Sequence, residues 1–190
     1  DLVQDLNSDY GKILKINILD FSHEIFSIGH RNPQGLVFID KDNIFSSEHG
    51  PYGGDEINKI EKNKNYGWPY YTYGTDYGTK SWPLNNKLKL DNYKEPIVSW
   101  TPSIAVSNLI FYNSKYLPKW KNNFIVSTLR DKNLYRITLS KNYRRMINVE
   151  KIKIDYRMRD IIVDSRGRII ILTDTKNNDV APKIIILENK

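Results

Sequence analysis

Short apolar runs separated by turn residues dominate the pattern of hydrophobic and polar positions along the chain. Residues 12–18 alternate polar and apolar side chains, which is typical of a strand with one buried face. No segment shows the apolar spacing of an amphipathic helix. A long irregular stretch, 62–95, is rich in Gly, Asn, Pro and Tyr. The expected strands cover residues 12–18, 35–39, 43–47, 56–61, 97–100, 109–112, 124–128, 134–139, 149–154, 160–163, 169–173 and 183–187. The pattern predicts an all-β chain.

A weak repeat runs through these strands. Its unit is an apolar strand, a turn and a second apolar strand that ends in a small hydroxyl residue. Copies begin at Gly35, Asn108 and Asp160, which lie 73 and 52 residues apart. Repeats of this length with about four strands each are typical of β-propeller blades. We therefore predict a partial β-propeller of about three blades over residues 1–190, without a separate second domain. Such a set cannot close a ring, so a missing propeller half or a partner chain is expected to complete it.

Composition narrows the possible functions. The 190 residues include 39% hydrophobic positions and carry a formal net charge of +7. Lys is spread along the whole chain among acidic residues, whereas a nucleic-acid site concentrates its basic residues, so no nucleic-acid partner is expected. Cys is absent, which excludes thiolate and disulfide chemistry. No apolar run approaches the length of a membrane span. The chain begins with Asp1 and lacks a signal-peptide pattern, which we interpret as an internal fragment or a processed product.

The motif GHRNPQG, residues 29–35, is the first candidate for a site. Arg31 offers a planar fork of donors that matches carboxylates, and Asn32 offers both a donor and an acceptor. A loop at the head of an inner propeller strand directs its side chains toward the central channel. The alternative is a plain strand-entry turn with an exposed Arg.

Oxygen-rich segments follow in SEHGPYGGDEIN, 47–58, and NYGWP, 65–69. Gly50 and Pro51 would expose backbone carbonyls, and Asp55 and Glu56 add two carboxylates, with Asp76 further along. Calcium takes six to eight hard oxygen ligands of this mixed type. The spacing is not that of an EF-hand, and Asp-Gly loops are common in turns, so a calcium site and an ordinary turn both remain open.

Basic residues recur near the ends of later strands. Arg157 and Arg159 stand two apart in YRMRD, so an extended backbone places them on one face, where they repel unless an anion lies between them. Arg130 ends the strand of the second repeat. With Arg31, these residues supply four basic groups from three blades, and a polycarboxylate at the mouth of the channel would satisfy them. A solvated basic edge is the alternative for the pair in YRMRD.

The ordered combination of GHRNPQG, EHGP, GDEIN, NYGWP, WTPSIA, YRMRDI and ILTD resembles the soluble quinoprotein sugar dehydrogenases. The resemblance covers nearly the whole chain, and the pairing of GHRNPQG with GDEIN and NYGWP is its most specific part. It implies the C-terminal half of a six-bladed β-propeller that is periplasmic or secreted. It also implies an enzyme that uses pyrroloquinoline quinone and calcium to oxidise an aldose at C1 to the lactone, with an electron acceptor that the sequence does not identify.

The resemblance also implies roles for individual residues. The cofactor-contacting residues would be Arg31, Asn32, Arg130, Arg157 and Arg159. A calcium ion beside the quinone would take the backbone carbonyls of Gly50 and Pro51, and a second, structural calcium would use Asp55, Glu56, Tyr66, Thr72 and Asp76. Trp100 would line the sugar entrance.

Several features depart from the family pattern. The general base of the family is a His in an earlier blade, and neither His23, His30 nor His49 stands at its place, so no catalytic residue is assigned within this chain and the isolated chain is expected to be inactive. Arg130 stands where the glucose enzymes carry Lys. Related propellers without enzymatic activity exist, so a non-catalytic module that binds a protein or a glycan is the alternative function.

Overall fold

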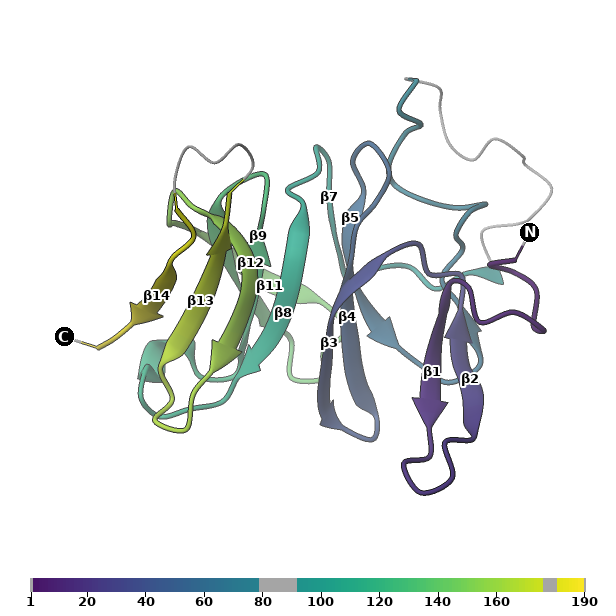
Figure 1. Cartoon of the computed structure of the whole chain (residues 1–190), viewed down its shortest axis with the longest axis horizontal. Helices are drawn as coiled ribbons and strands as arrows, with labels where there is room; N and C mark the ends of the chain where they lie inside the picture. Colours follow the sequence, from purple (N-terminus) through teal and green to yellow (C-terminus); the bar gives the residue numbers. More distant parts are fainter. Residues whose placement is uncertain (1, 79–91, 176–180, 190) are drawn as a thin grey trace.

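The structure is a computed structural model that describes residues 2–78, 92–175 and 181–189. These residues form four β-sheets in which most strand pairs are antiparallel (Figure 1). Two sheets have four strands, in the orders β3-β4-β5-β7 and β8-β9-β10-β11, and two have three, in the orders β1-β2-β6 and β12-β13-β14. The strands are β1 (Lys12–Ile16), β2 (His23–Ile28), β3 (Pro33–Asp40), β4 (Asn43–Glu48), β5 (Asp55–Ile60), β6 (Lys64–Asn65), β7 (Val98–Trp100), β8 (Val106–Tyr112), β9 (Asn123–Thr128), β10 (Asn133–Leu139), β11 (Met146–Lys153), β12 (Arg157–Val163), β13 (Ile169–Asp174) and β14 (Ile184–Leu187). The predictions of an all-β chain and of a partial propeller are confirmed.

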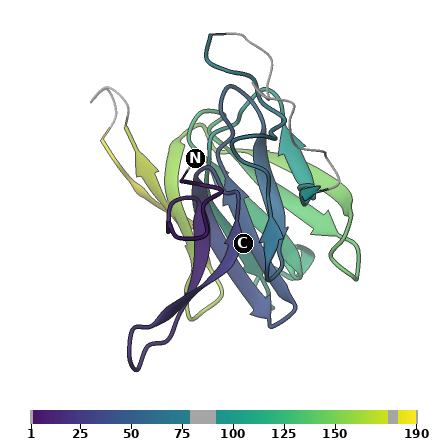
Figure 2. The same ribbon diagram turned by 90° about the vertical axis from the view of Figure 1, so that its right-hand side faces the viewer.

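The sheets stand side by side in the order of the sequence, with the first strands of the last three sheets facing one another across the array (Figure 1). These three sheets correspond to the three repeats expected from the sequence. The turn between β1 and β2 extends beyond the other sheets (Figure 2). The chain therefore has the side-by-side sheet arrangement of propeller blades.

The first sheet, β1-β2-β6, was not expected as a separate unit. β2 has no clear alternation of exposed and buried side chains, and β6 is only two residues long. β6 pairs with β2 in parallel, with Ser27 opposite Lys64 and Ile28 opposite Asn65. The strands β3, β4 and β5 of the second sheet lie between these two strands in the sequence. A pairing between segments so far apart in the sequence leaves no local pattern from which to predict it.

Helical structure adds little to this architecture. A 3₁₀ turn, η2 (Pro118–Trp120), lies between β8 and β9. Among the described segments, no helix has the length and apolar character needed to cross a membrane.

Two apolar cores lie between neighbouring sheets. One packs Phe45 and Ile57 of the second sheet against Leu109 and Phe124 of the third. The other packs Ile125 of the third sheet, among others, against residues of β12 and β13. The third sheet is thus covered on both faces, and all six residues of β9 are buried. This burial explains why Phe124 to Val126 form three consecutive apolar positions instead of an alternating pattern.

Gly35 permits the close approach of β3 to β8, the first strands of two adjacent sheets. A Cβ atom added at Gly35 would lie 2.5 Å from the backbone N of Leu109 and 2.7 Å from Oδ1 of Asn108. Both distances are below van der Waals contact, and one of the atoms belongs to the backbone of the neighbouring sheet. A side chain at this position would therefore push the two sheets apart.

Gly35→Ala should lower the free energy of unfolding by about 1–3 kcal/mol, because it overpacks the boundary between two sheets. Urea unfolding monitored by tryptophan fluorescence measures this loss. Gly78→Ala is the matched control, since the nearest atom of the described residues to a Cβ there is Oδ2 of Asp76, at 3.5 Å. Equal midpoints for the two variants would contradict the tight packing assigned to Gly35.

Candidate functional site

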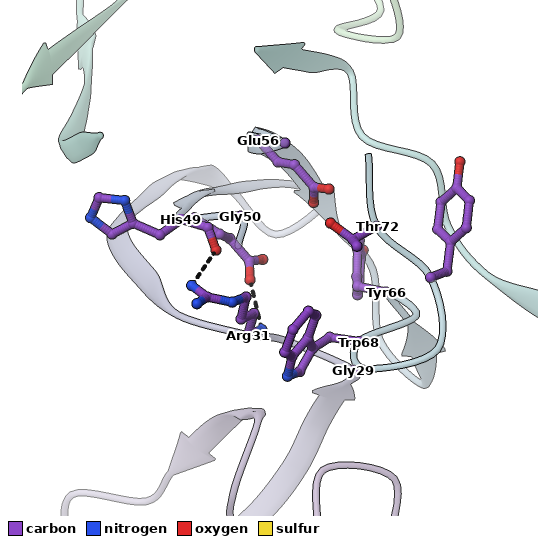
Figure 3. A pocket seen from close by; sticks show the side chains of 11 residues that line it. Gly29, Arg31, His49, Gly50, Glu56, Tyr66, Trp68 and Thr72 are labelled. Carbon is purple, nitrogen blue, oxygen red and sulfur yellow. Dashed lines mark hydrogen bonds between the residues drawn. The ribbon is translucent and has the colours of Figure 1, made fainter. Parts of the chain in front are cut away.

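Two hollows meet at the loops that precede β3 and follow β4. The first, called here the small hollow, has a volume of about 10 Å³, which is room for one water-sized particle. Figure 3 shows Glu56 reaching from β5 toward Thr72, with Arg31 and Trp68 on the opposite wall. Its lining residues are Gly29, Arg31, Glu48, His49, Gly50, Gly54, Glu56, Tyr66, Trp68, Tyr71 and Thr72.

Negative charge is concentrated at the small hollow. Glu48 and Glu56 share one amide, since Nδ2 of Asn58 donates to Oε1 of Glu48 at 3.0 Å and to Oε2 of Glu56 at 3.1 Å. Burial, and after it the charge of Glu48, raises the pKa of Glu56 to about 8. Among the described residues, no Lys or Arg forms an ion pair with Glu56. The ionised Glu56 carboxylate therefore lacks a compensating charge in the protein itself.

His30 provides the partner for the other carboxylate. It is fully buried; its Nδ1 lies 2.7 Å from Oε1 of Glu48, and its Nε2 lies 2.8 Å from Oγ of Ser27. Burial alone would raise the pKa of Glu48, but the charge and hydrogen bond of His30 outweigh it and lower that pKa. The imidazole also stacks on Tyr66 at a centroid distance of 4.7 Å. Glu48 is thus ionised and paired with His30. Glu56 is the carboxylate of this hollow that a bound cation would stabilise.

The small hollow fits a hard cation on the chemistry of its donors. Glu56 contributes a carboxylate and Thr72 a hydroxyl to its lining, which also includes Gly29 and Tyr66. No group of three or more His, Cys, Asp or Glu side chains that could hold a metal occurs in the described parts of the chain. An ion here would therefore depend on backbone, hydroxyl and water oxygens besides Glu56, which is a ligand set that calcium accepts.

The second hollow, called here the open hollow, has a volume of about 630 Å³. That volume lies within the range of small-molecule sites. Among the residues that the structure describes, two Arg and no Asp or Glu line it, so this lining presents a positive surface. Its lining residues are Arg31, Asn32, His49, Gly50, Pro51, Tyr52, Tyr77, Ser103, Ala105 and Arg130.

Arg31 lies at the wall between the two hollows. Its Nη1 donates to the backbone O of His49 at 3.2 Å, and its Nη2 donates to Oη of Tyr77 at 3.4 Å. The guanidinium lies over the ring of Trp68, 5.2 Å from the centroid. Its Nε is buried and has no hydrogen-bond partner within residues 2–78, 92–175 and 181–189. A buried donor without a partner is rare in folded proteins, and it points to an acceptor supplied by a ligand.

Asp55 and Glu56 are neighbours in the sequence but serve different surroundings. Successive side chains of a strand point to opposite faces, and the structure follows that rule at the start of β5. Glu56 lines the small hollow, whereas the Asp55 side chain lines neither hollow and accepts hydrogen bonds from Gly50, Ser103 and Ala105. The structure therefore separates two residues that the sequence analysis assigned to one calcium site.

Arg157 and Arg159 lie outside the lining of the open hollow and share an acidic partner. Their Nη2 atoms lie 3.7 and 2.5 Å from Oδ2 of Asp174 on the paired strand β13. Asp174 is the anion that the sequence required between two guanidiniums on one face. Arg157 Nη1 also donates to the carbonyl of Leu129 at 3.4 Å, one residue before Arg130, and its buried Nε has no partner. Arg157 is therefore beside the hollow, while half-exposed Arg159 is farther along the strand.

Most of the other predicted site residues line one of the two hollows. Arg31, Asn32, Gly50, Pro51 and Arg130 come together at the open hollow, and Glu56, Tyr66 and Thr72 come together at the small one. Asp76 and Trp100 line neither.

Trp100 packs instead against the apolar core between the second and third sheets. Its ring makes an edge contact with Tyr135 at a centroid distance of 5.7 Å. Its backbone O accepts a hydrogen bond from the N–H of Gly54 at 2.8 Å. In this structure Trp100 therefore braces the sheets next to the site, and its role at a sugar entrance stays a prediction.

Five residues that line the open hollow were not predicted from the sequence: His49, Tyr52, Tyr77, Ser103 and Ala105. His49 and Tyr52 lie within the SEHGPYGGDEIN segment, and Ser103 and Ala105 lie within WTPSIA, so their motifs were noticed but the residues were given no role. Tyr77 belongs to the irregular stretch, where no local pattern indicates which residues face a ligand.

The sequence profile of glucose/sorbosone dehydrogenases matches residues 1–182, so the chain belongs to the glucose/sorbosone dehydrogenase family. The resemblance to quinoprotein sugar dehydrogenases seen in the motifs is confirmed. The chain is 36% identical over 160 residues to the aldose sugar dehydrogenase YliI of Escherichia coli, a match that covers 83% of this chain and 43% of that protein.

Solved structures agree with this assignment. A crystal structure of a glucose dehydrogenase superposes with a TM-score of 0.86 at 28% identity, over 99% of this chain and 57% of that one. A form of the aldose sugar dehydrogenase of Streptomyces coelicolor with bound pyrroloquinoline quinone superposes with a TM-score of 0.71 at 26% identity, over 98% of this chain and 54% of that one. The chain thus spans about half the length of the relatives it matches.

Proposed function

We propose that this chain forms the cofactor-binding part of an aldose dehydrogenase that uses pyrroloquinoline quinone and calcium. The observation that carries the proposal is the open hollow, where Arg31, Asn32 and Arg130 converge and no carboxylate lines the wall. A cofactor with three carboxylates suits such a surface, because paired guanidinium and carboxylate groups offset each other's loss of hydration. The buried Nε of Arg31, which has no hydrogen-bond partner among the described residues, supports the same proposal.

Each of these residues of the open hollow would have its own role in binding the cofactor. Arg31 and Arg130 bind carboxylates, and Asn32 orients the ligand by donating and accepting hydrogen bonds. Arg157, beside Arg130, adds positive charge from the next sheet. Gly50 and Pro51 would hold a calcium ion through their backbone carbonyls, and this ion with a bound quinone would supply the electron-accepting chemistry for oxidation of the sugar at C1.

A second calcium ion would occupy the small hollow. Glu56 would hold it through its carboxylate, with oxygens of Tyr66 and Thr72 completing part of its shell. This ion would be structural, because the hollow is too small to admit a substrate. Its effect would be to offset the charge of Glu56 and to tie β5 to the loops around Tyr66 and Thr72.

The proposal assigns the general base to residues outside this chain. His30 is buried and paired with Glu48, and His23 is an exposed residue of β2, so neither is placed to take a proton from a sugar. His49 lines the open hollow, but the resemblance assigns the base elsewhere. The chain would then be one part of a longer propeller, the whole being a periplasmic or secreted protein whose electron acceptor remains to be identified.

Dye reduction by the complete protein tests the proposal. With calcium and pyrroloquinoline quinone, the protein should reduce a redox dye when given an aldose and should release the lactone. The corresponding alditol is the matched control, since it lacks the hemiacetal hydroxyl at C1. If no aldose in a broad panel drives reduction, and no quinone absorbance remains with the protein after desalting, the alternative of a non-catalytic binding propeller is favoured.

A further inference from the structure

Asp55, the first residue of β5, is a fully buried carboxylate whose hydrogen bonds connect two separate loops. Its Oδ1 accepts from the backbone N–H of Gly50 at 3.1 Å. Its Oδ2 accepts from Oγ of Ser103 at 2.7 Å and from the backbone N–H of Ala105 at 2.6 Å. Nδ1 of His49 lies 3.8 Å from Oδ1. Three hydrogen-bond donors and the nearby His49 ring therefore surround this carboxylate.

These donors belong to the residues that form the open hollow. His49 and Gly50 come from the loop after β4, and Ser103 and Ala105 come from the connection between β7 and β8. All four line the open hollow, whereas Asp55 itself does not. The carboxylate is thus located behind the wall and joins its two halves.

Ala105 has a strained backbone conformation that its hydrogen bond to Asp55 stabilises. Its φ is +57°, a left-handed conformation that costs a residue with a Cβ atom roughly 1 kcal/mol or more. Such a conformation persists only where surrounding contacts favour it, and a short hydrogen bond from the Ala105 N–H to a buried charge is a contact of that kind. Without Asp55, the connection between β7 and β8 would lose this restraint.

The charge of Asp55 is consistent with that role. Burial favours the neutral acid, but the hydrogen bonds from His49, Ser103 and Gly50 outweigh burial and lower the pKa of Asp55. The ionised group accepts hydrogen bonds on both oxygens, which the geometry requires. Glu56, the next residue, points to the opposite face and has the reverse shift.

We propose that Asp55 is a positioning residue, which holds the 49–51 loop and the 103–105 loop in register at the open hollow, and not a ligand of the cation beside Glu56. The part of this inference that concerns cofactor affinity rests on the proposed function. The part that concerns the two loops does not, because it depends only on the hydrogen bonds of Asp55.

Three substitutions in the complete protein separate the positioning role from metal ligation. Asp55→Asn keeps the shape but replaces one acceptor oxygen with a donor. Ser103→Ala removes a single donor and leaves every carboxylate in place. Glu56→Gln removes the charge of the Glu56 side chain at the small hollow and leaves the Asp55 contacts intact. Each variant is first checked for a cooperative unfolding transition.

Amide hydrogen exchange, measured without cofactor, reports on the loops directly. Asp55→Asn should increase exchange at Gly50 and Ala105 by at least about tenfold, and Glu56→Gln should leave both unchanged, because an amide loses protection when its acceptor is removed. An increase spread over the whole β3-β4-β5-β7 sheet, or none at these two amides, would overturn the positioning role.

Binding of pyrroloquinoline quinone at saturating calcium, followed by its absorbance, supplies the second measurement. Asp55→Asn should raise the Kd about 10- to 100-fold and Ser103→Ala about 3- to 10-fold, while both variants keep the calcium stabilisation that Glu56→Gln abolishes. If Asp55→Asn instead loses calcium stabilisation as Glu56→Gln does, and Ser103→Ala binds normally, Asp55 is a metal ligand and the inference fails. A wild-type protein that binds no quinone refutes the proposed function, and hydrogen exchange still decides the role of Asp55.

Discussion

Replacing Glu56 with Gln should stabilise the protein in a chelator and destabilise it, relative to the wild type, in calcium. Without a cation, the Gln removes a buried carboxylate that burial and Glu48 disfavour, and the free energy of unfolding at pH 7.5 should rise by about 1–3 kcal/mol. With calcium at about 1,000 times its Kd, the wild type gains about 4.1 kcal/mol that the variant cannot gain. Chemical unfolding under both conditions measures the reversal.

The pH dependence of the chelated wild type follows from the same group. The pKa of Glu56 is raised from 4.5 to about 8 in the folded protein, so the folded state binds this proton more tightly than the unfolded state. Stability contributed by the protonated group is present at low pH and falls as pH rises from about 5 to about 8, by at most about 1.4 kcal/mol per unit. Glu56→Gln should lack this slope.

Glu24→Gln is a matched control for both measurements, because Glu24 is an exposed carboxylate on β2, paired with Lys15 and Lys62. Its substitution should change stability little and equally with and without calcium. If Glu56→Gln shifts stability in the same direction in chelator and in calcium, the small hollow is not a cation site.

Arg31→Ala should weaken binding of pyrroloquinoline quinone by at least about 100-fold. Arg31 faces both hollows and is held by the His49 carbonyl, the Tyr77 hydroxyl and the face of Trp68, so its guanidinium is oriented before a ligand arrives. A preoriented group loses little conformational entropy on binding, which makes its contacts worth more. Arg31→Lys keeps the charge but loses the planar fork, and an intermediate loss of about tenfold is expected. Equilibrium titration in saturating calcium measures both values.

Arg166→Ala is the control for the loss of a positive charge, because Arg166 is an exposed residue of the turn between β12 and β13. It should bind the cofactor within a factor of about two of the wild type. Binding by Arg31→Ala that matches this control, in a protein with an unchanged unfolding midpoint, would remove Arg31 from the cofactor site.

Local sequence patterns predicted most of the fold. The turn Asp164–Gly167 and the apolar runs on either side of it specify the β12–β13 hairpin, because turn preference and strand periodicity act over a few residues. The same logic fails for β6, whose partner β2 lies far away in the sequence. Residues that gather from one short motif, such as Arg31 with Asn32, were also predictable, since their loop reaches the hollow as a unit.

For the candidate site too, some features follow from local sequence and others depend on the tertiary structure. By itself, the sequence determined that the chain is all-β, that GHRNPQG and EHGP are candidates for its ligand-facing loops, and that Glu56 is a candidate for holding a cation. Only the tertiary structure decided that Asp55 faces away from Glu56, that Asp174 pairs with Arg157 and Arg159, and that Trp100 packs into the core. The physical reason is that side-chain direction in a strand depends on where the strand begins and on which sheet packs against it, and neither is encoded in the few residues around a motif.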